Sequence, residues 1–476
     1  MSYKTLVGLE IHVELMTERK MFCNCKNEFG AMPNTNVCPV CLGLPGALPV
    51  MDKEAVKYAI MAGIAFNCEI DRTIIMDRKS YFYPDLTKGY QISQSDFPLC
   101  KGGFLEIDLE ESTKKIRLER IHIEEDTGKQ IHTDHETTLL DFNRSGVPLI
   151  EIVTKPDINS AEEARLFLEK LKNTIKYIGI SDVKMEEGSL RCDVNINVVD
   201  EDKGIKSNIS EIKNLNSFKS VVKAIEYEQK RHIELLESGS NTDKETRRFN
   251  ELTGETILMR KKFQASDYRY QFEADLKPIQ ITEDWIKEIE STMPELPDQK
   301  KKRFIKQYNI TEYDASVLTQ SKELSFFYEE LVSLIEDSKL AANWVMTDVM
   351  RRLKEEDKEI SELNLTAQSL AELLNYVKSG KINNNTAKKV LREMLETDKT
   401  ASFIIEKNGL IQISDEDELE KIIDEVIKEN QQSVEDFKNG KDRALGFLMG
   451  QIMKKTKGKA NPNTANKMLI DKINGN

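Results

Sequence analysis

The sequence predicts an α+β protein in which a large, mainly antiparallel sheet precedes helical domains. Before residue 293, several segments alternate apolar and polar residues, as half-buried strands do. After Pro294 and Pro297, glycine becomes scarce and apolar residues recur at helical spacing. A chain of 476 residues is also too long for one ordinary domain. We therefore expect a sheet domain over residues 1–293, a helical domain over 294–410 and a small helical tail over 411–476.

The expected strands place polar residues on one face of the sheet. Residues 6–15 and 190–198 alternate cleanly, whereas residues 147–153 form an apolar run with a single carboxylate. In residues 116–125 the apolar residues change from even to odd positions between Leu118 and Ile121, which predicts a bulge or bend in the strand. The polar positions are Glu10, His12 and Glu14 in the first segment, Arg191, Asp193, Asn195 and Asn197 in the second, and Glu151 in the apolar run.

Two helices are expected among these strands. Ser160 followed by Glu163 is typical of a capping box, and apolar residues then line one face until Gly179. A second helix is expected from Ser217 to about Ser238. Residues 298–408 are predicted to form a helical bundle, and residues 408–414 a linker before the tail.

The composition excludes several classes of protein. Hydrophobic residues make up 39% and charged residues 32% of the chain, which is typical of a globular protein with a large core. The longest apolar stretch, around residues 59–66, is much shorter than the roughly 20 residues of a membrane span. The first residues alternate like a strand and do not resemble a signal peptide. We expect a cytoplasmic protein with no membrane partner.

Charge is distributed unevenly along the chain. The net charge of −13 argues against a protein that coats polyanions in general. From Lys438 to Asn476, however, nine basic residues stand against two aspartates. A helix with Ala444, Phe447, Leu448 and Ile452 on its inner face would bring several of these lysines together. This pattern fits either contacts to RNA phosphates or a solubilising end. The candidate phosphate contacts are Lys441, Lys454, Lys455, Lys457 and Lys459.

Four of the seven cysteines form a compact motif. Cys23-x-Cys25 is separated by twelve residues from Cys38-x-x-Cys41. Two close pairs with a short spacer favour a structural zinc site over four free thiols, because a metal stabilises neighbouring thiolates. An odd number of cysteines does not fit a closed disulfide framework. The other three, Cys68, Cys100 and Cys192, are expected to be small apolar residues.

The common catalytic motifs are absent from the sequence. There is no GxxxxGK[ST] loop, no GxGxxG after a strand and no serine-rich nucleophile run of the amidase type. What remains is a distributed set of carboxylates. These side chains either bind a divalent cation or lie exposed on a strand face with Glu151 in a salt bridge, and the pattern alone favours the second interpretation. The set comprises Glu10, Glu124, Glu125, Glu151 and Asp193, with His12 beside them.

A loop rich in basic and aromatic residues is a candidate nucleotide site. Residues 77–94 intersperse Arg78, Lys79 and Lys88 with tyrosines such as Tyr81. This mixture fits a pocket for phosphate and adenosine, although a loop with exposed lysines explains it equally well.

Taken in order, the motifs resemble one family along essentially the whole chain, the B subunits of the tRNA-dependent amidotransferases. The segments that carry this resemblance are VGLEIHVEL (7–15), PNTNVCPVCLGLPGALPV (33–50), DRKSYFYPDLTKGYQISQ (77–94), HIEEDTGK (122–129), NRSGVPLIEIVTKPDI (143–158), VKMEEGSLRCDVN (183–195), ETRRF (245–249), SDYRY (266–270), MPELP (293–297), QSVEDFKNGK (432–441) and ALGFLMGQIMKKTKGKANP (444–462).

The resemblance implies a ligase that amidates Glu-tRNA(Gln), Asp-tRNA(Asn) or both. ATP would phosphorylate the side-chain carboxylate of the tRNA-bound amino acid, and ammonia would then displace phosphate. The implied partners are an amidase-like A subunit that supplies ammonia from glutamine, a small C subunit that completes a heterotrimer, the two tRNAs, and a non-discriminating aminoacyl-tRNA synthetase.

The resemblance also assigns roles to particular residues. The sheet domain would be a catalytic cradle, and the tail would bind the tRNA elbow. Implied catalytic residues are Glu10, His12, Glu125 and Glu151. One Mg²⁺ would use His12, Glu125 and Glu151, and a second would use Glu10, Glu124 and Asp193. Candidate contacts to ATP are Lys79, Tyr81, Lys88 and Arg191, and a structural Zn²⁺ would use Cys23, Cys25, Cys38 and Cys41.

Two other classes of function remain open at this point. One is a non-catalytic scaffold that binds tRNA and retains a vestigial cation site. The other is a phosphotransferase that acts on a small carboxylic acid. ATP cleavage that depends on a mischarged tRNA would distinguish the three.

Overall fold

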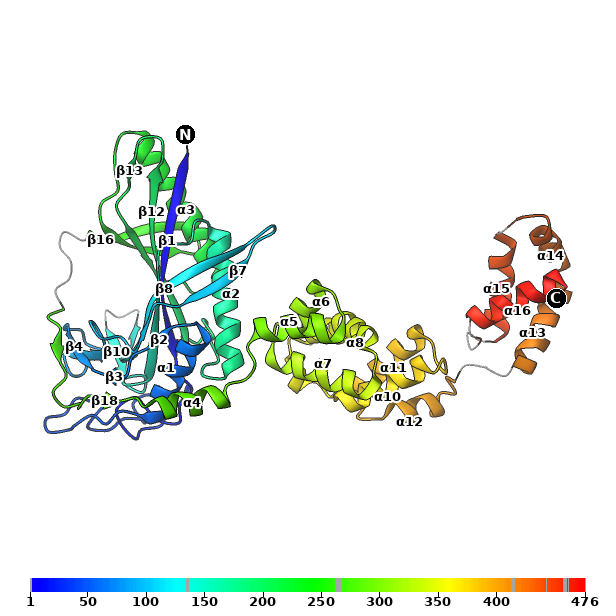
Figure 1. Cartoon of the computed structure of the whole chain (residues 1–476), viewed down its shortest axis with the longest axis horizontal. Coiled ribbons are helices and arrows are strands. Elements are labelled where there is room, and N and C mark those ends of the chain that lie inside the picture. Colours follow the sequence, from blue (N-terminus) through cyan, green and yellow to red (C-terminus); the bar gives the residue numbers. More distant parts are fainter. Residues whose placement is uncertain are drawn as a thin grey trace. The chain divides into compact units, whose positions relative to one another are not determined.

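The computed structural model describes residues 2–133, 137–261, 268–411, 416–441, 443–456, 460 and 462–475. The chain divides into two compact units, Met1–Pro297 and Asp298–Asn476. The first contains the sheets and the second is helical (Figure 1). This arrangement confirms the predicted α+β class.

The first unit is built around one large sheet with the strand order β16-β15-β14-β12-β1-β11-β8-β6-β2, in which β13 also pairs with β12 and β7 with β8. Within the described residues, its neighbouring strands are antiparallel except for β14 and β15. The strands are β1 (Tyr3–Glu14), β2 (Glu69–Ile70), β6 (Cys100–Lys101), β7 (Phe104–Asp108), β8 (Thr113–Glu125), β11 (Pro148–Thr154), β12 (Leu190–Asp200), β13 (Ile205–Lys206), β14 (Ser210–Lys213), β15 (Glu245–Asn250) and β16 (Glu255–Lys261).

The register of the central strands aligns their polar residues. On β1, His12 lies opposite Arg191 of β12 and opposite Glu151 of β11. Glu151 in turn lies opposite His122 of β8. Between β11 and β8 the register shifts where Thr154 pairs with Leu118, which confirms the predicted bulge. One face of the sheet therefore carries a continuous polar strip across several strands.

The opposite face of the sheet is apolar and is covered by helices. Val7, Leu9, Ile11 and Val13 of β1 belong to the same buried cluster as residues of α1 (Lys53–Ala65), α2 (Ala161–Ile178) and α3 (Phe218–Glu237). In Figure 1 these helices lie against the sheet of the first unit. The last helix of this unit is α4 (Glu283–Thr292).

Both predicted helices begin and end at the expected residues. The Ser160 hydroxyl accepts from the backbone N–H of Glu163, and Gly179 ends α2 in a left-handed conformation. Ser217 caps α3 in the same way. The capping box itself is incomplete, because the Glu163 carboxylate accepts from the N–H of Asn159, one residue before the cap.

Smaller sheets bring the basic and aromatic loop to the end of β8. Gln91 and Ser93 of β5 donate to the Glu125 carbonyl and the Glu124 carboxylate, respectively. The small strands are β4 (Asp77–Ser80), β5 (Tyr90–Ser93) and β17 (Gln271–Phe272) in one sheet, β9 (Lys129–His132) and β10 (Thr138–Asp141) in a second, and β3 (Thr73–Ile74) and β18 (Ile279–Gln280) in a third.

The second unit contains two separate hydrophobic clusters in its described part. The first belongs to α5 (Pro297–Tyr308), α6 (Glu312–Leu318), α7 (Lys322–Ile335), α8 (Ser338–Trp344), η1 (Val345–Val349), α9 (Met350–Glu356), η2 (Ile360–Glu362), α10 (Ala367–Lys378), α11 (Asn384–Glu396) and α12 (Ala401–Lys407). The second belongs to α13 (Glu416–Glu429), α14 (Gln431–Lys438), α15 (Arg443–Lys455) and α16 (Pro462–Asn474).

The predicted inner face of the tail helix is correct only in part. On α15, Leu448 and Ile452 are fully buried, whereas Phe447 is 49% exposed. Leu445 and Met449 pack against the cluster instead. None of the helices in the described part of the chain is long and apolar enough to cross a membrane.

Candidate metal and catalytic site

The polar strip of the large sheet brings one histidine and two carboxylates together. Nε2 of His12 lies 3.3 Å from Oε1 of Glu124 and 3.6 Å from Oε2 of Glu151. One potential ligand atom from each residue lies within 4.8 Å of the other two. The residues come from β1, β8 and β11, which are neighbours in the sheet. We call these three residues the histidine–carboxylate group.

A second histidine, His122, supports this group and was not predicted as a site residue. Its Nε2 lies 3.1 Å from Oε2 of Glu151 and 3.6 Å from Oε2 of Glu124. His122 is buried, and it shares a face with Glu124 because it lies two residues earlier on β8. This alternation in residues 122–124 was the available sequence signal.

The histidines and carboxylates of this site stabilise each other's charged forms. Burial alone would lower the pKa of both histidines. The hydrogen bonds and negative charges of Glu124 and Glu151 have a larger, opposite effect, so the pKa of His12 is raised and that of His122 rises to about 9. Burial alone would raise the pKa of the two carboxyl groups. The hydrogen bonds and positive charges of the histidines have a larger, opposite effect, so the pKa of Glu151 falls to about 2 and that of Glu124 lies well below its usual range. The carboxylates are thus held ionised, as cation ligands must be.

The histidine–carboxylate group fits a divalent cation. Mg²⁺ is usually bound by one or two carboxylates while it keeps several waters, and imidazole is a less usual ligand for it. Glu124 and Glu151 supply the carboxylates, and His12, whose side chain is 25% exposed, would supply the imidazole after a cation displaces its proton. His122 remains as the neighbour that orients the carboxylates.

Glu125, which was expected to complete this group, does not join it. The neighbouring residue Glu124 takes its place, because successive side chains of a strand point to opposite sides. Glu125 instead accepts hydrogen bonds from Nζ of Lys88 and, at 3.0 Å, from the backbone N–H of Ile92. Lys88 was expected to contact the nucleotide, but in the structure its ammonium is paired with Glu125.

A second carboxylate group lies further along the polar strip. Potential ligand atoms of Glu10, Asp193 and Glu211 lie within 4.8 Å of one another. Glu10 and Asp193 were predicted to share a cation with Glu124. In the structure Glu124 belongs to the histidine–carboxylate group, and Glu211 is the third member of this second group. Nζ of Lys213 is paired with Asp193 and lies 2.9 Å from Oε1 of Glu211. The Lys213 ammonium therefore already neutralises part of the charge that a second metal ion would balance.

Basic and aromatic side chains lie close to the histidine–carboxylate group. Burial lowers the pKa of Lys79, but the charge of Glu124 outweighs it and the pKa is raised. Nζ of Lys79 lies 5.0 Å from the ring centre of Tyr268. The Tyr268 ring is 6.1 Å from that of Tyr81 and 6.2 Å from that of Tyr270, both edge to face. A lysine among aromatic rings matches the environment expected for a nucleotide.

Arg191 lies across from His12 and carries an unused donor. Its guanidinium is paired with Asp126, and Nη2 is 3.8 Å from Oε1 of Glu14. Its Nε is buried and has no hydrogen-bond partner among the residues that the structure describes. Burial and the neighbouring charge of Asp126 raise the pKa of Glu14 to about 8.

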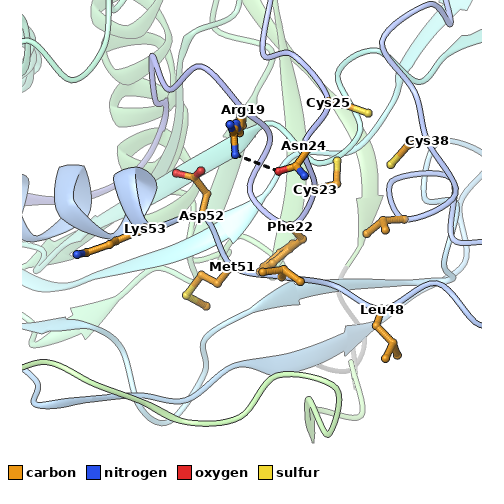
Figure 2. A pocket seen from close by; sticks show the side chains of 12 residues that line it. Arg19, Phe22, Cys23, Asn24, Cys25, Cys38, Leu48, Met51, Asp52 and Lys53 are labelled. Atoms are coloured by element: carbon orange, nitrogen blue, oxygen red, sulfur yellow. Dashed lines mark hydrogen bonds between the residues drawn. The ribbon is translucent and has the colours of Figure 1, made fainter.

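The four cysteines of the predicted zinc motif converge. Their Sγ atoms lie within 4.8 Å of one another, and those of Cys38 and Cys41 are 3.9 Å apart. A tetrahedral zinc with Zn–S bonds of about 2.3 Å would place its sulfurs about 3.8 Å apart, so the geometry fits. Figure 2 shows Cys23, Cys25 and Cys38 turned toward one another beside a cavity of about 680 Å³. The three other cysteines are buried or half-buried, as expected.

A buried lysine adjoins the four cysteines. Lys20 has no exposed surface, its Nζ lies 3.8 Å from Sγ of Cys41, and it donates to the Phe142 carbonyl at 3.2 Å. The hydrogen bond from Cys23 lowers the pKa of Cys41 to about 5, and the Lys20 charge contributes although burial opposes it. A zinc ion with four thiolates has a net negative charge, which the Lys20 ammonium offsets. Buried lysines are rare, and its burial was not predicted.

The basic residues of the tail are partly neutralised. Nζ of Lys455 lies 3.0 Å from Glu425 and 2.7 Å from Glu429, both on α13. Lys441 is paired with a nearby aspartate at 2.8 Å, and Lys454 is exposed. The two other candidate phosphate contacts, Lys457 and Lys459, lie outside the described residues.

The chain carries a GatB/GatE catalytic domain, because the pattern of this family matches residues 5–287, which contain the large sheet and its polar strip. The pattern of the GatB domain matches residues 326–473. The aspartyl/glutamyl-tRNA(Asn/Gln) amidotransferase B subunit of Finegoldia magna is 54% identical over 99% of this chain and 100% of its own length. The B subunit of Caldicellulosiruptor saccharolyticus is 52% identical, with 99% of each chain covered. The chain therefore belongs to the family of aspartyl/glutamyl-tRNA(Asn/Gln) amidotransferase B subunits, as its motifs predict.

Proposed function

We propose that this chain activates the side-chain carboxylate of a mischarged tRNA in the ATP-dependent amidation of Glu-tRNA(Gln), Asp-tRNA(Asn) or both. The observation that carries the proposal is the histidine–carboxylate group on the polar strip, beside Lys79. Membership of a family whose relatives are named for the two tRNAs supports the choice of substrate.

The chemistry has two balanced steps. A carboxylate oxygen of the tRNA-bound side chain attacks the γ-phosphorus of ATP, and the bond to ADP breaks, which gives an acyl phosphate. Ammonia then attacks the acyl carbon, phosphate leaves, and a proton is released to give the amide. Both partners of the first step are anions, so their repulsion must be neutralised. A bound divalent cation supplies that neutralisation at the phosphate oxygens.

The protein's own residues prepare this step. His12, Glu124 and Glu151 would hold the cation, and His122 keeps the two carboxylates oriented through its contacts with both. The Lys79 ammonium would bind the phosphoryl group as it moves, because electrostatic stabilisation of the transition state is a large part of phosphoryl transfer. Closure of the site around the substrates would shield the acyl phosphate from water.

The chain is proposed to work within a heterotrimer. It lacks an amidase nucleophile motif, so an amidase-like A subunit would release ammonia from glutamine, and a small C subunit would brace the pair. The relatives are themselves named as the B subunits of an amidotransferase, which supports this division of labour. A zinc ion held by the four cysteines would have a structural role, and the tail would contact the tRNA elbow.

The test is amide formation by this chain with its A and C partners, ATP, Mg²⁺ and glutamine, using both mischarged tRNAs. The proposal predicts Gln-tRNA(Gln), Asn-tRNA(Asn) or both, and no product without ATP. A tRNA-binding scaffold would form no amide and cleave no ATP. A phosphotransferase for small acids would cleave ATP with free glutamate in the absence of tRNA, and either result would refute the proposal.

A further inference from the structure

Lys79, the lysine beside the histidine–carboxylate group, lies in a small sheet that fixes its position weakly. Its strand, β4, pairs with β5, and in the described residues β17 pairs with β4 through Gln271 and Phe272 alone. Such small sheets have little stability of their own. A lysine side chain is also long and flexible, and misplacement of a reacting group by about 1 Å can cost roughly a hundredfold in rate. Other contacts are therefore needed to hold Lys79.

The neighbouring residue, Arg78, makes contacts of this kind. Successive side chains of a strand point to opposite sides, so Arg78 points away from the side that Lys79 occupies. Its Nε and Nη2 each donate to one carboxylate oxygen of Glu273 at 2.8 Å, and Nη2 also donates to Asp275 at 3.1 Å. Glu273 has no exposed surface. A bidentate pair with a buried carboxylate fixes the guanidinium in one orientation.

An aromatic ring holds the Arg78 guanidinium from another direction. Its Cζ atom lies 4.5 Å from the ring centre of Tyr90, on the adjacent strand β5. Arg78 therefore joins three segments: its own strand, β5 through Tyr90, and residues 273–275 through the two carboxylates. A lysine at this position would keep the charge, but it would lose both the planar pairing and the stacking on the ring.

The segment that contains Glu273 also carries an aromatic ring beside Lys79. The carbonyl of Tyr268, whose ring is 5.0 Å from Nζ of Lys79, accepts from the N–H of Ser80 at 2.8 Å. The N–H of Glu273 donates to the Met76 carbonyl at 2.9 Å. These two bonds flank the pairing of β17 with β4, so residues 268–273 run alongside β4. The Arg78–Glu273 pair thus fixes the strand of Lys79 and the segment of Tyr268 against each other.

The backbone of this segment is strained next to Tyr268. Arg269 has a φ of +44°, which residues other than glycine rarely adopt. Strain of this kind persists where the surrounding contacts impose it, and it is often found at functional sites. The buried pair of Glu273 with Arg78 lies a few residues further along the same segment and is one of the contacts that can impose it.

We propose that Arg78 and Glu273 are positioning residues for phosphoryl transfer, which hold Lys79 and the Tyr268 ring beside the histidine–carboxylate group without touching ATP, the cation or the tRNA. This inference rests on the proposed function, in which Lys79 binds the phosphoryl group as it moves. Because Lys79 then acts on the group in transfer, loss of the pair should lower kcat. The KM for tRNA and the requirement for Mg²⁺ should change little.

The test is a double-mutant cycle in the complete heterotrimer, with ADP formation in the presence of mischarged tRNA as the reaction. Glu273→Gln removes the charge of the buried carboxylate, whereas Arg78→Lys keeps both charges and loses the planar pairing. Each variant is made alone and together with Lys79→Met. A melting curve is recorded for every variant, and kcat is measured below the melting transition.

A matched control comes from a similar pair at the far end of β8. Arg117 donates to the two carboxylate oxygens of Asp157 at 2.8 and 2.7 Å. Seven positions separate Arg117 from Glu124 on this strand, which corresponds to about 23 Å at the rise of a strand. Asp157→Asn therefore breaks a bidentate arginine–carboxylate pair of the same unit away from Lys79, and it should keep the wild-type kcat.

Glu273→Gln and Arg78→Lys should each lower kcat by about tenfold or more in the otherwise wild-type protein. In the Lys79→Met background neither should lower kcat further, because the pair acts through Lys79. The KM for tRNA and the Mg²⁺ concentration for half-maximal rate should stay within about twofold of the wild-type values. If Glu273→Gln does not fold, Arg78→Lys, which keeps a positive charge beside the buried carboxylate, decides the question.

Equal fold losses of kcat with and without Lys79 would show that the pair acts independently of Lys79. That result overturns the inference and leaves the proposed function standing, as does a wild-type kcat in Glu273→Gln and Arg78→Lys or in Lys79→Met. If the wild-type complex forms no ADP with a mischarged tRNA, the proposed function fails and the inference fails with it.

Discussion

The assignment of Glu124, rather than Glu125, as a cation ligand can be tested by changing each residue to glutamine. Both carboxylates are buried, but their partners differ. Glu124 contacts Nε2 of His12 at 3.3 Å and Nε2 of His122 at 3.6 Å, whereas Glu125 is paired with Lys88. Glu124→Gln should therefore weaken the response to Mg²⁺, and Glu125→Gln should not.

The size of the effect of Glu124→Gln follows from the geometry. Two unit charges about 4 Å apart attract by about 4 kcal/mol at an effective dielectric constant of about 20, which is a lower bound for a carboxylate that contacts a divalent cation directly. The amide dipole retains part of this attraction, so we expect a loss of about 3 kcal/mol, or roughly a hundredfold in Mg²⁺ affinity or rate. For Glu125→Gln, the Lys88 side chain, 13% exposed, loses its partner. Breaking a buried ion pair costs about 3–5 kcal/mol of stability, so its main effect should be a lower melting temperature.

The assay is amide formation at saturating ATP and tRNA over a range of Mg²⁺ concentrations, with a melting curve for each variant. The Mg²⁺ concentration for half-maximal rate should rise strongly in Glu124→Gln and stay near the wild-type value in Glu125→Gln. The reasoning is refuted if Glu125→Gln raises the Mg²⁺ requirement and Glu124→Gln leaves it unchanged.

Three further predictions concern the zinc site and the tail. Metal analysis of freshly purified protein should give about one zinc per chain, and Cys41→Ser should release it; four freely titrating thiols in the wild type would contradict the site. Lys20→Met should speed zinc loss to a chelator by about tenfold or more, whereas the exposed control Lys26→Met should not; equal rates would remove the role of Lys20. Deletion of residues 415–476 should weaken tRNA binding strongly and reduce its salt dependence, while glutamine hydrolysis by the partner is largely retained; equal tRNA affinity would show that the tail is only a solubilising end.

Features encoded by neighbouring residues could be predicted from the sequence. Alternation in residues 6–15 and 190–198 identified the polar face, and capping residues such as Ser160 and Gly179 located the ends of helices. The cysteine cluster was also predictable, because its four members lie within nineteen positions of one another.

Features that depend on pairing between distant segments could not be predicted in the same way. The choice between Glu124 and Glu125 depends on the register of β8 against β11 and on the packing of β5 against the end of β8. Glu211 lies on β14, a strand too short to show a clear period. The burial of Lys20 depends on loops that fold around the cysteines, and no local pattern indicates it.

In the tail, too, the packing between helices could not be predicted from the sequence. Spacing alone placed Phe447 on the inner face of its helix, but the neighbouring helices cover the face formed by Leu448 and Ile452 and leave Phe447 half exposed. Which side of an amphipathic helix is covered depends on its partners, and α13, α14 and α16 are those partners here.

The central claim is that this chain transfers a phosphoryl group to the side chain of a mischarged tRNA. The most direct measurement is ATP cleavage by the heterotrimer in the absence of glutamine and ammonia, with Glu-tRNA(Gln) or Asp-tRNA(Asn) compared with the correctly charged Gln-tRNA(Gln) and Asn-tRNA(Asn). ADP should form only with a mischarged tRNA, and replacement of Glu151 by glutamine should abolish it while tRNA binding persists. ADP formation that is the same with either tRNA, or unaffected by Glu151→Gln, would contradict the account.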